Sequence, residues 1–207
     1  MMANRLLGTV DLTSLRRQSN LMAQRPDTQL DLDRLIAVAF AHLEEEGLDA
    51  LSMRRLAARI GVQAPALYWH VSDKGQLLSL MAGNIYAAAH AGVAPAENWR
   101  DWLVAFGWSL RATFLAHRDG ARLCALAPAP SGSDREDYAR KVANPLVVLG
   151  LPEDKALAFQ ASMISFTLGW AMFETNGPMR EYLQTLFNFD ESFETGLNAL
   201  VIGLPPA

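Results

Sequence analysis

Residues 52–78 read SMRRLAARIGVQAPALYWHVSDKGQLL and gather basic and aromatic side chains around one short turn. The guanidinium of Arg54 can bind guanine through two parallel hydrogen bonds. Tyr68, His70 and Lys74 carry donors that suit phosphate oxygens, which fix the position of a protein on DNA without reading its sequence. These residue types predict a nucleic-acid-binding surface on which Arg54 reads bases and the other three grip the backbone.

Further residues complete this surface. Base edges are expected to face the start of a second short helix, which carries Gln63, Ala64, Pro65 and Ala66. The methyl groups at positions 64 and 66 can contact the methyl group of thymine. Ser52 is expected to cap the preceding helix.

Four side chains of the stretch have two interpretations each. Arg54 either reads bases or is a solvated charge at a helix end. Trp69 either presses on the sugar–phosphate backbone or fills the small core of the domain. Arg55 and Arg59 are either phosphate contacts or solvated surface charges. The residues alone leave these alternatives open.

The elements that position these side chains are expected to be helices throughout, because apolar residues recur at helical spacing and the period-two alternation of strands is absent. The N-terminal helices are expected at residues 31–46, 53–60, 63–70 and 73–91. Later helices are expected at about 98–116, 119–127, 134–149, 153–175, 179–187 and 190–203. The chain is thus predicted to be all-α.

The spacing of Leu56, Ala57, Gly61, Val62 and Leu67 predicts a helix-turn-helix. A small residue lets two helices cross closely, a glycine makes the turn and the aliphatic residues lock the pair. An ordinary pair of antiparallel helices in a bundle is the alternative. We expect a mobile arm at residues 1–28, a DNA-binding domain at 29–75 and a second domain at 76–207, with helix 73–91 connecting them.

The charge of the chain agrees with a local DNA-binding surface. The net charge is −4, yet residues 50–80 carry four basic side chains against one acidic side chain. Salt screens electrostatic interactions beyond about 8–10 Å under physiological conditions. A basic patch on an acidic protein can therefore still bind phosphates. The arginines of the N-terminal arm are either minor-groove contacts or solubilising charges.

The single cysteine, Cys124, excludes an internal disulfide. The N-terminus lacks the apolar run of a signal peptide, and no run of about 20 apolar residues occurs. We therefore expect a cytoplasmic protein with no membrane partner.

The stretch 52–78 closely resembles the DNA-binding signature of TetR-type transcriptional repressors. The segments 116-AHRDGARL-123 and 166-FTLGWAMFE-174 resemble the core domain of the tetracycline-repressor branch. The resemblance implies an all-helical homodimer that binds a pseudo-palindromic DNA operator and is released by a small molecule. Helix 73–91 would transmit the signal from the ligand to the DNA-binding domain.

The resemblance also implies a ligand cleft. We expect it to be lined by His90, Phe106, Leu110, Cys124, Trp170, Phe173 and Glu174. By the resemblance, Cys124 stands where tetracycline repressors have a metal-binding histidine, and Phe106 stands where they have a drug-binding asparagine. Mg²⁺ prefers oxygen ligands. We therefore expect no metal, no cofactor and no tetracycline, but an apolar or aromatic effector. Several of these side chains are alternatively plain core residues, and Glu174 is alternatively a local ion-pair partner.

Helix 153–175 is apolar nearly all round and is expected to be buried on one side by a partner protomer. The predicted dimer interface consists of Ala158, Ser162, Ser165, Gly169, Leu197, Leu200 and Val201. Packing of these residues within one protomer is the alternative. An activator, a ligand-independent regulator and, more remotely, a small enzyme using His90, Cys124 and Glu174 are the competing functions.

Overall fold

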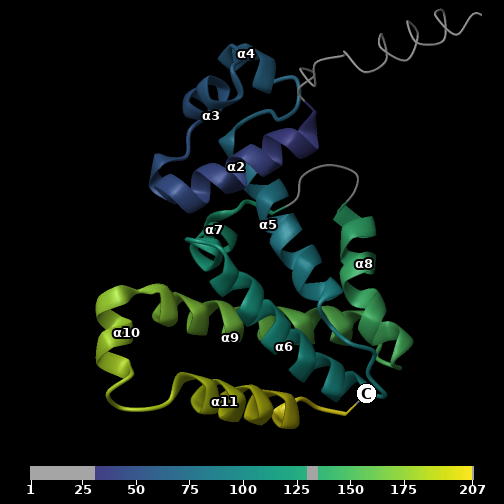
Figure 1. The fold of residues 1–207 in the computed structure, drawn as a ribbon. Helices are drawn as coiled ribbons and strands as arrows, with labels where there is room; N and C mark the ends of the chain where they lie inside the picture. Colours follow the sequence, from purple (N-terminus) through teal and green to yellow (C-terminus); the bar gives the residue numbers. More distant parts are fainter. Residues whose placement is uncertain (1–30, 130–134, 207) are drawn as a thin grey trace, which may run out of the picture. The chain divides into compact units, whose positions relative to one another are not determined.

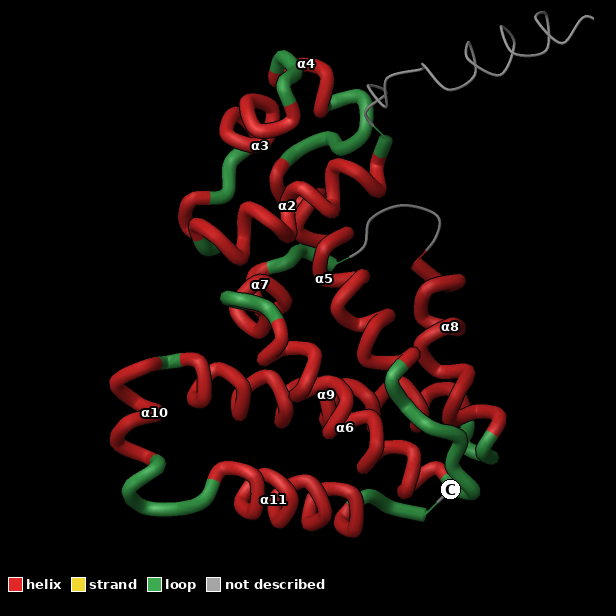
Figure 2. Tube along the Cα trace, in the orientation of Figure 1, coloured by secondary structure: helices red, strands yellow, loops and turns green. Residues whose placement is uncertain are grey.

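The computed structural model describes residues 31–129 and 135–206, and every regular element in these ranges is a helix (Figures 1 and 2). The all-α prediction is confirmed. The predicted arm at residues 1–28 lies outside the described residues.

The first helices form a small helix-turn-helix unit. They are α2 (Leu32–Glu46), the 3₁₀ helix η1 (Leu48–Ala50), α3 (Met53–Ile60) and α4 (Ala64–Leu67). The side chain of Ser52 accepts a hydrogen bond from the Arg55 amide and caps α3. Gly61 ends α3 at a φ of 83°, which a residue with a side chain adopts only at a cost. The caps and the turn glycine thus lie where the sequence predicts them.

Helix α5 (Lys74–Ala91) joins the helix-turn-helix to the second group of helices. Its N-cap is Asp73, whose carboxylate accepts a hydrogen bond from the Gln76 amide at 2.8 Å. Its buried face, which includes Leu77, Met81 and Ile85, packs against α2, α6 and α7. Movement of α5 would therefore change the packing of both the helix-turn-helix unit and the second group of helices.

The second group consists of α6 (Trp99–Ala116), α7 (Gly120–Leu126), α8 (Arg135–Val148), α9 (Glu153–Thr175), α10 (Gly177–Leu183) and α11 (Phe189–Gly203). Helix α9 packs against each of the other five (Figure 1). Helices α6 and α11 approach closely at Gly107, where an added Cβ would lie 2.6 Å from a methyl carbon of Leu197. A side chain at position 107 would therefore require Leu197 to shift.

Helix α9 is, among the described residues, the one helix long and apolar enough to cross a membrane. It also forms the centre of the second group, where Met163, Thr167 and Ala171 are fully buried. Only 33% of the most apolar stretch of α9 is buried within the protomer. One face of α9 is therefore left uncovered.

Polar contacts tie η1, which follows α2, to α7 and its N-cap residue. Arg122 binds Asp49 through two hydrogen bonds of 2.7 and 2.9 Å. The carboxylate of Asp119 accepts the Leu48 amide at 2.9 Å. The segment 116-AHRDGARL-123 thus supports the helix-turn-helix from the side of the core.

Two helix predictions need correction. The second motif helix, predicted at 63–70, ends at Leu67, because tight turns then carry the chain back so that Val71 is buried. The helix predicted at 179–187 begins at Gly177 and ends at Leu183. Asn176 caps it, and Pro178 fits in its first turn, where no amide donor is needed.

Candidate functional site

The aromatic residues after α4 lie in an exposed turn between two buried anchors. Leu67 and Val71 are 0% and 1% exposed, whereas Tyr68 is 51% and Trp69 is 89% exposed. His70 is half-buried. The core alternative for Trp69 is therefore wrong, and its ring is open to an external partner.

The start of α4 presents a smooth, uncharged edge. Gln63 and Pro65 are exposed, and Ala64 and Ala66 are half-buried. Pro65 occupies the first turn of the helix, where it needs no amide donor. The only long polar side chain at this edge is that of Gln63.

The three arginines of α3 differ in their partners. Arg55 donates to Glu46 at 2.7 Å, and Arg59 donates to Glu45 at 2.7 Å. Arg54 is exposed and has no hydrogen-bond or ion-pair partner among the described residues. Arg54 is thus the arginine of α3 that is free to bind DNA, while the other two stabilise the α2–α3 contact.

The N-terminus of α5 adjoins the aromatic turn. Lys74 is the first residue of the helix and is half-buried. The side-chain oxygen of Gln76 accepts a hydrogen bond from the Ser72 amide. This bond links the first turn of α5 to the segment that carries Tyr68, Trp69 and His70.

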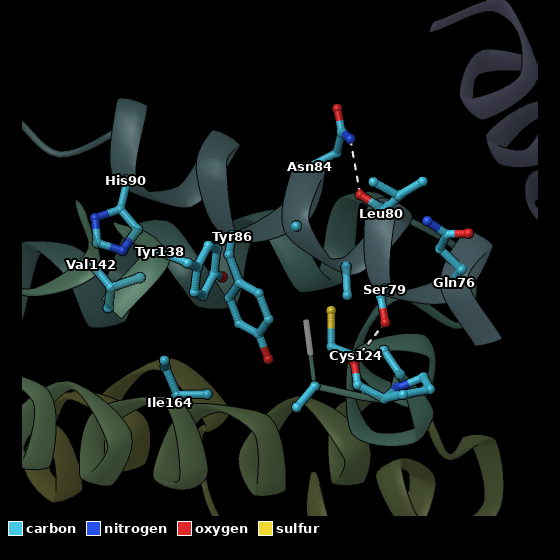
Figure 3. A pocket seen from close by; sticks show the side chains of 15 residues that line it. Gln76, Ser79, Leu80, Asn84, Tyr86, His90, Cys124, Tyr138, Val142 and Ile164 are labelled. Atoms are coloured by element: carbon cyan, nitrogen blue, oxygen red, sulfur yellow. Dashed lines mark hydrogen bonds between the residues drawn. The ribbon is translucent and has the colours of Figure 1, made fainter. Parts of the chain in front are cut away.

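A cavity of about 670 Å³ lies beside α5, bounded by α7, α8 and α9 (Figure 3). One face of α5 lines it from end to end, with residues at alternating spacings of three and four. These residues are Gln76, Ser79, Gly83, Tyr86 and His90. The opposite walls include Cys124, Tyr138, Val142 and Ile164 (Figure 3). The volume is within the range of about 300–1,000 Å³ that is typical of small-molecule sites.

The titratable groups of this cavity are held in their neutral forms. Burial lowers the pKa of His90 and so disfavours the imidazolium. Burial raises the pKa of Cys124 to about 12, although a hydrogen bond with Tyr86 opposes the shift. Burial also raises the pKa values of Tyr86 and Tyr138.

The structure does not assemble the seven predicted ligand residues in one cleft. His90 and Cys124 line the cavity beside α5. Phe106 and Leu110 are 0% exposed and belong to the core of the second group. Trp170 and Phe173 line a separate apolar hollow of about 330 Å³ between α9, α10 and the start of α11. The prediction of a single cleft with these seven walls is therefore wrong.

Glu174 belongs to a buried ion pair. Its carboxylate accepts two hydrogen bonds from Arg111, at 2.6 and 2.7 Å, and Arg111 also donates to Asp190 at 2.6 Å. Both Arg111 and Glu174 are almost fully buried. Such a pair joins α6, α9 and α11, so Glu174 is a local ion-pair partner and not a wall of the cavity beside α5.

These contacts decide how well the residues suit a metal ion. Within residues 31–129 and 135–206, no group of three His, Cys, Asp or Glu side chains is placed to hold one. The Cys124 thiol is protonated at neutral pH because of its raised pKa, and the Glu174 carboxylate is taken up by Arg111. The donor set does not fit Mg²⁺, which binds through ionised or carbonyl oxygens.

Several cavity residues escaped the sequence reasoning, namely Gln76, Ser79, Asn84, Tyr86 and Tyr138. A signal for some of them was present. Gln76, Ser79, Gly83, Tyr86 and His90 recur at spacings of three and four and so share one face of α5, and most of their side chains are polar. Tyr138 lies on α8, and nothing in the chain order indicates that α8 faces α5.

Comparison with known proteins agrees with this architecture. Residues 35–81 match the model for bacterial regulatory proteins of the tetR family, and residues 92–185 match the model for the tetracyclin repressor-like C-terminal domain. The tetracycline repressor protein class E of Escherichia coli is 32% identical over 194 residues, which cover 84% of this chain and 90% of that protein.

The chain belongs to the TetR family.

Solved structures of family members are similar along most of the chain. A minocycline complex of a variant TetR from Acinetobacter baumannii AYE has a TM-score of 0.69 and 31% identity, and covers 84% of this chain and 96% of that one. The Streptomyces coelicolor TetR-family protein ActR in complex with (S)-DNPA has a TM-score of 0.68 and 28% identity, with the same coverage of both chains. Both are structures with a small molecule bound.

Family membership makes the chain a helix-turn-helix transcriptional regulator of the tetracycline-repressor-like branch, and not an enzyme. The geometry agrees, because Glu174 lies apart from the cavity that holds His90 and Cys124. The enzyme alternative is thus dropped.

The predicted dimer residues of this TetR-family chain fall into two groups. Ala158, Ser162, Ser165 and Gly169 lie on the exposed face of α9. Leu197 and Val201 are 0% and 2% exposed within the protomer, and Leu200 is half-buried. Leu197 and Val201 are therefore core residues, contrary to the prediction, because α11 turns this face toward α6 and α9.

Proposed function

We propose that the protein is a repressor that binds a pseudo-palindromic operator as a homodimer and is released by an apolar or aromatic effector bound in the cavity beside α5. The observation that carries the proposal is that one helix, α5, begins beside the exposed aromatic turn and lines the cavity along its length. The site of action is the cytoplasm, where an operator is accessible.

The DNA-binding surface consists of Ser52, Arg54, Gln63, Ala64, Pro65, Ala66, Tyr68, Trp69, His70 and Lys74. Arg54 reads guanine, and the small residues at 64 and 66 let the backbone of α4 approach thymine methyl groups. Tyr68, Trp69, His70 and Lys74 grip the sugar–phosphate backbone. The exposure of Trp69 supports this role.

Dimerisation uses the uncovered face of α9. Ala158, Ser162, Ser165 and Gly169 form a smooth stripe against which another helix can pack closely. Its companion on α11 is the outer face with Ala199 and Ile202, of which Ile202 is 76% exposed. A two-fold axis through these helices would place two α4 helices in successive major grooves, about 34–36 Å apart.

Effector binding is coupled to DNA through two polar contacts at the start of α5. The Ser79 hydroxyl donates to the carbonyl of Pro128 at 2.6 Å, and Gln76 accepts the Ser72 amide. Both side chains also line the cavity (Figure 3). A molecule that binds there competes for these contacts, moves the start of α5 and changes the spacing of the DNA-binding surfaces. The molecule acts by binding more tightly to the conformation in which the two DNA-binding surfaces of the dimer are too widely spaced for the operator.

The experiment is release of labelled operator duplex, followed by fluorescence anisotropy against a panel of apolar and aromatic compounds. Gly83→Leu fills the cavity, because Gly83 lines it and an added Cβ meets no atom within 4 Å. The control is Ala88→Leu, because Ala88 is exposed and does not line the cavity. We expect release to persist in Ala88→Leu and to be lost in Gly83→Leu. The proposal is contradicted if Gly83→Leu is still released from the operator, or if no compound releases the full chain.

A further inference from the structure

The cavity beside α5 is lined, among the described residues, without a single Asp, Glu, Lys or Arg. Its polar groups are amides, hydroxyls, one thiol and one imidazole, contributed by Gln76, Ser79, Asn84, Tyr86, His90, Cys124 and Tyr138. The amides do not titrate, the hydroxyls and the thiol are neutral when protonated, and the imidazole is neutral when it carries one proton. No side chain of the described lining can therefore neutralise a charge on a bound molecule.

Burial keeps the titratable members of this lining neutral at physiological pH. The pKa of His90 is lowered, and the pKa values of Tyr86, Cys124 and Tyr138 are raised. All four shifts have desolvation as their largest cause, because these four side chains are partly withdrawn from water. A charged molecule would meet the same cost without a compensating partner.

The placement of the polar groups also restricts the shape of the occupant. Gln76 and His90 stand fourteen residues apart on one face of α5, which is about 21 Å at the rise of an α-helix. In Figure 3, Gln76 and Ser79 lie at one end of the cavity, His90 lies at the other, and Tyr86 and Tyr138 lie between them. Hydrogen bonds are thus offered along the length of the cavity, and aliphatic side chains such as Val142 and Ile164 offer apolar contact.

We infer that the effector is an uncharged, elongated molecule that binds along α5 without a metal ion, through hydrogen bonds to neutral donors and acceptors. The inference rests on the proposed function, since it specifies the chemical class of the molecule that this cavity takes. Carboxylates, sulfonates, amines and anion–metal chelates are excluded from the class, because the described lining offers no charged partner and no metal ligands.

The test uses two fluorescent probes that share one scaffold and differ in charge. N-phenyl-1-naphthylamine is neutral, and 8-anilinonaphthalene-1-sulfonate carries a sulfonate on the same ring system. Both are titrated into the full chain, into Gly83→Leu and into the exposed control Ala88→Leu. Only the fluorescence that Gly83→Leu removes is assigned to the cavity, so binding to other apolar surfaces is subtracted. Thermal melting verifies that both variants are folded.

We expect the neutral probe to bind the full chain and Ala88→Leu, to lose this binding in Gly83→Leu, and to bind the cavity at least about tenfold more tightly than the sulfonate. Equal or tighter binding of the sulfonate at the Gly83→Leu-sensitive site would overturn the inference. Neutral-probe binding that Gly83→Leu leaves unchanged would overturn it as well. Operator binding by the full chain is measured separately. If the chain shows the expected probe selectivity but binds no operator, the proposed function fails and the inference about the cavity remains.

Discussion

Trp69 is the most exposed large apolar side chain in the described part of the chain, at 89%, next to Leu67 at 0%. An exposed tryptophan in a small helical domain adds little to stability, because its apolar area stays in water. The neighbouring buried leucine does the opposite. The two residues therefore separate DNA contact from folding.

We predict that Trp69→Ala lowers operator affinity at least about tenfold, the loss expected when a good contact is removed, and leaves the melting temperature unchanged. Leu67→Ala is the matched control and should cost about 2–5 kcal/mol of unfolding free energy. Anisotropy titration and thermal melting give the two readouts. A fall in melting temperature in Trp69→Ala comparable to that of the control would show that the ring belongs to the core after all.

Arg54 and Arg59 provide a second contrast, since Arg59 is paired with Glu45 and Arg54 has no partner among the described residues. Arg54→Ala should cost about 1–3 kcal/mol of operator binding and relax the preference for one base pair. Arg59→Ala should change operator affinity much less. Competition with single-base operator variants measures both effects, and equal losses in the two variants would argue against base reading by Arg54.

At the scale of elements, α5 joins the cavity to the DNA-binding turn through the bond between Gln76 and the Ser72 amide. Gln76→Leu should speed hydrogen exchange at Ser72 and weaken operator binding several-fold, because the turn is less firmly held. Asn84→Leu is the control, since Asn84 lines the same cavity but bonds only to Leu80 of its own helix. Unchanged exchange at Ser72 in Gln76→Leu would remove this residue from the coupling.

The contact between α6 and α11 gives a prediction about stability. Gly107→Ala should destabilise the protein by about 1–3 kcal/mol, because the new Cβ would lie 2.6 Å from Leu197 and force the helices apart. Gly83→Ala, where no atom lies within 4 Å of the added Cβ, should be neutral or stabilise by up to about 1 kcal/mol. Chemical denaturation measures both, and equal stability of the two variants would contradict the close crossing.

Most helices could be predicted from the sequence because their ends are determined locally. Ser52, Gly61 and Asp73 fix helix ends through caps that depend on neighbouring residues alone. The cavity could not be predicted in the same way. Phe106 and Leu110 share apolar character with true cavity walls, and only the tertiary packing places them in the core. Arg111 was overlooked because its partners, Glu174 and Asp190, are 63 and 79 residues away along the chain.

At the scale of the whole molecule, the uncovered stripe of α9 is expected to join two protomers. Ser165→Arg places a charge in the stripe and should convert dimers to monomers in sedimentation experiments. Operator affinity should then fall by about 100-fold or more, because two linked half-sites no longer bind together. Asn144→Arg on the exposed face of α8 is the matched control. A dimeric Ser165→Arg variant would place the interface elsewhere.

Operator binding by a dimer is tested by selecting binding sites from a random duplex library with the full chain and then measuring the protein–DNA stoichiometry. We predict enrichment of one pseudo-palindrome with half-sites about 10–10.5 base pairs apart, bound by two protomers, and a relaxed preference at one base pair of each half-site with Arg54→Ala. Absence of an enriched sequence, or binding of a single half-site by one protomer, would contradict this prediction.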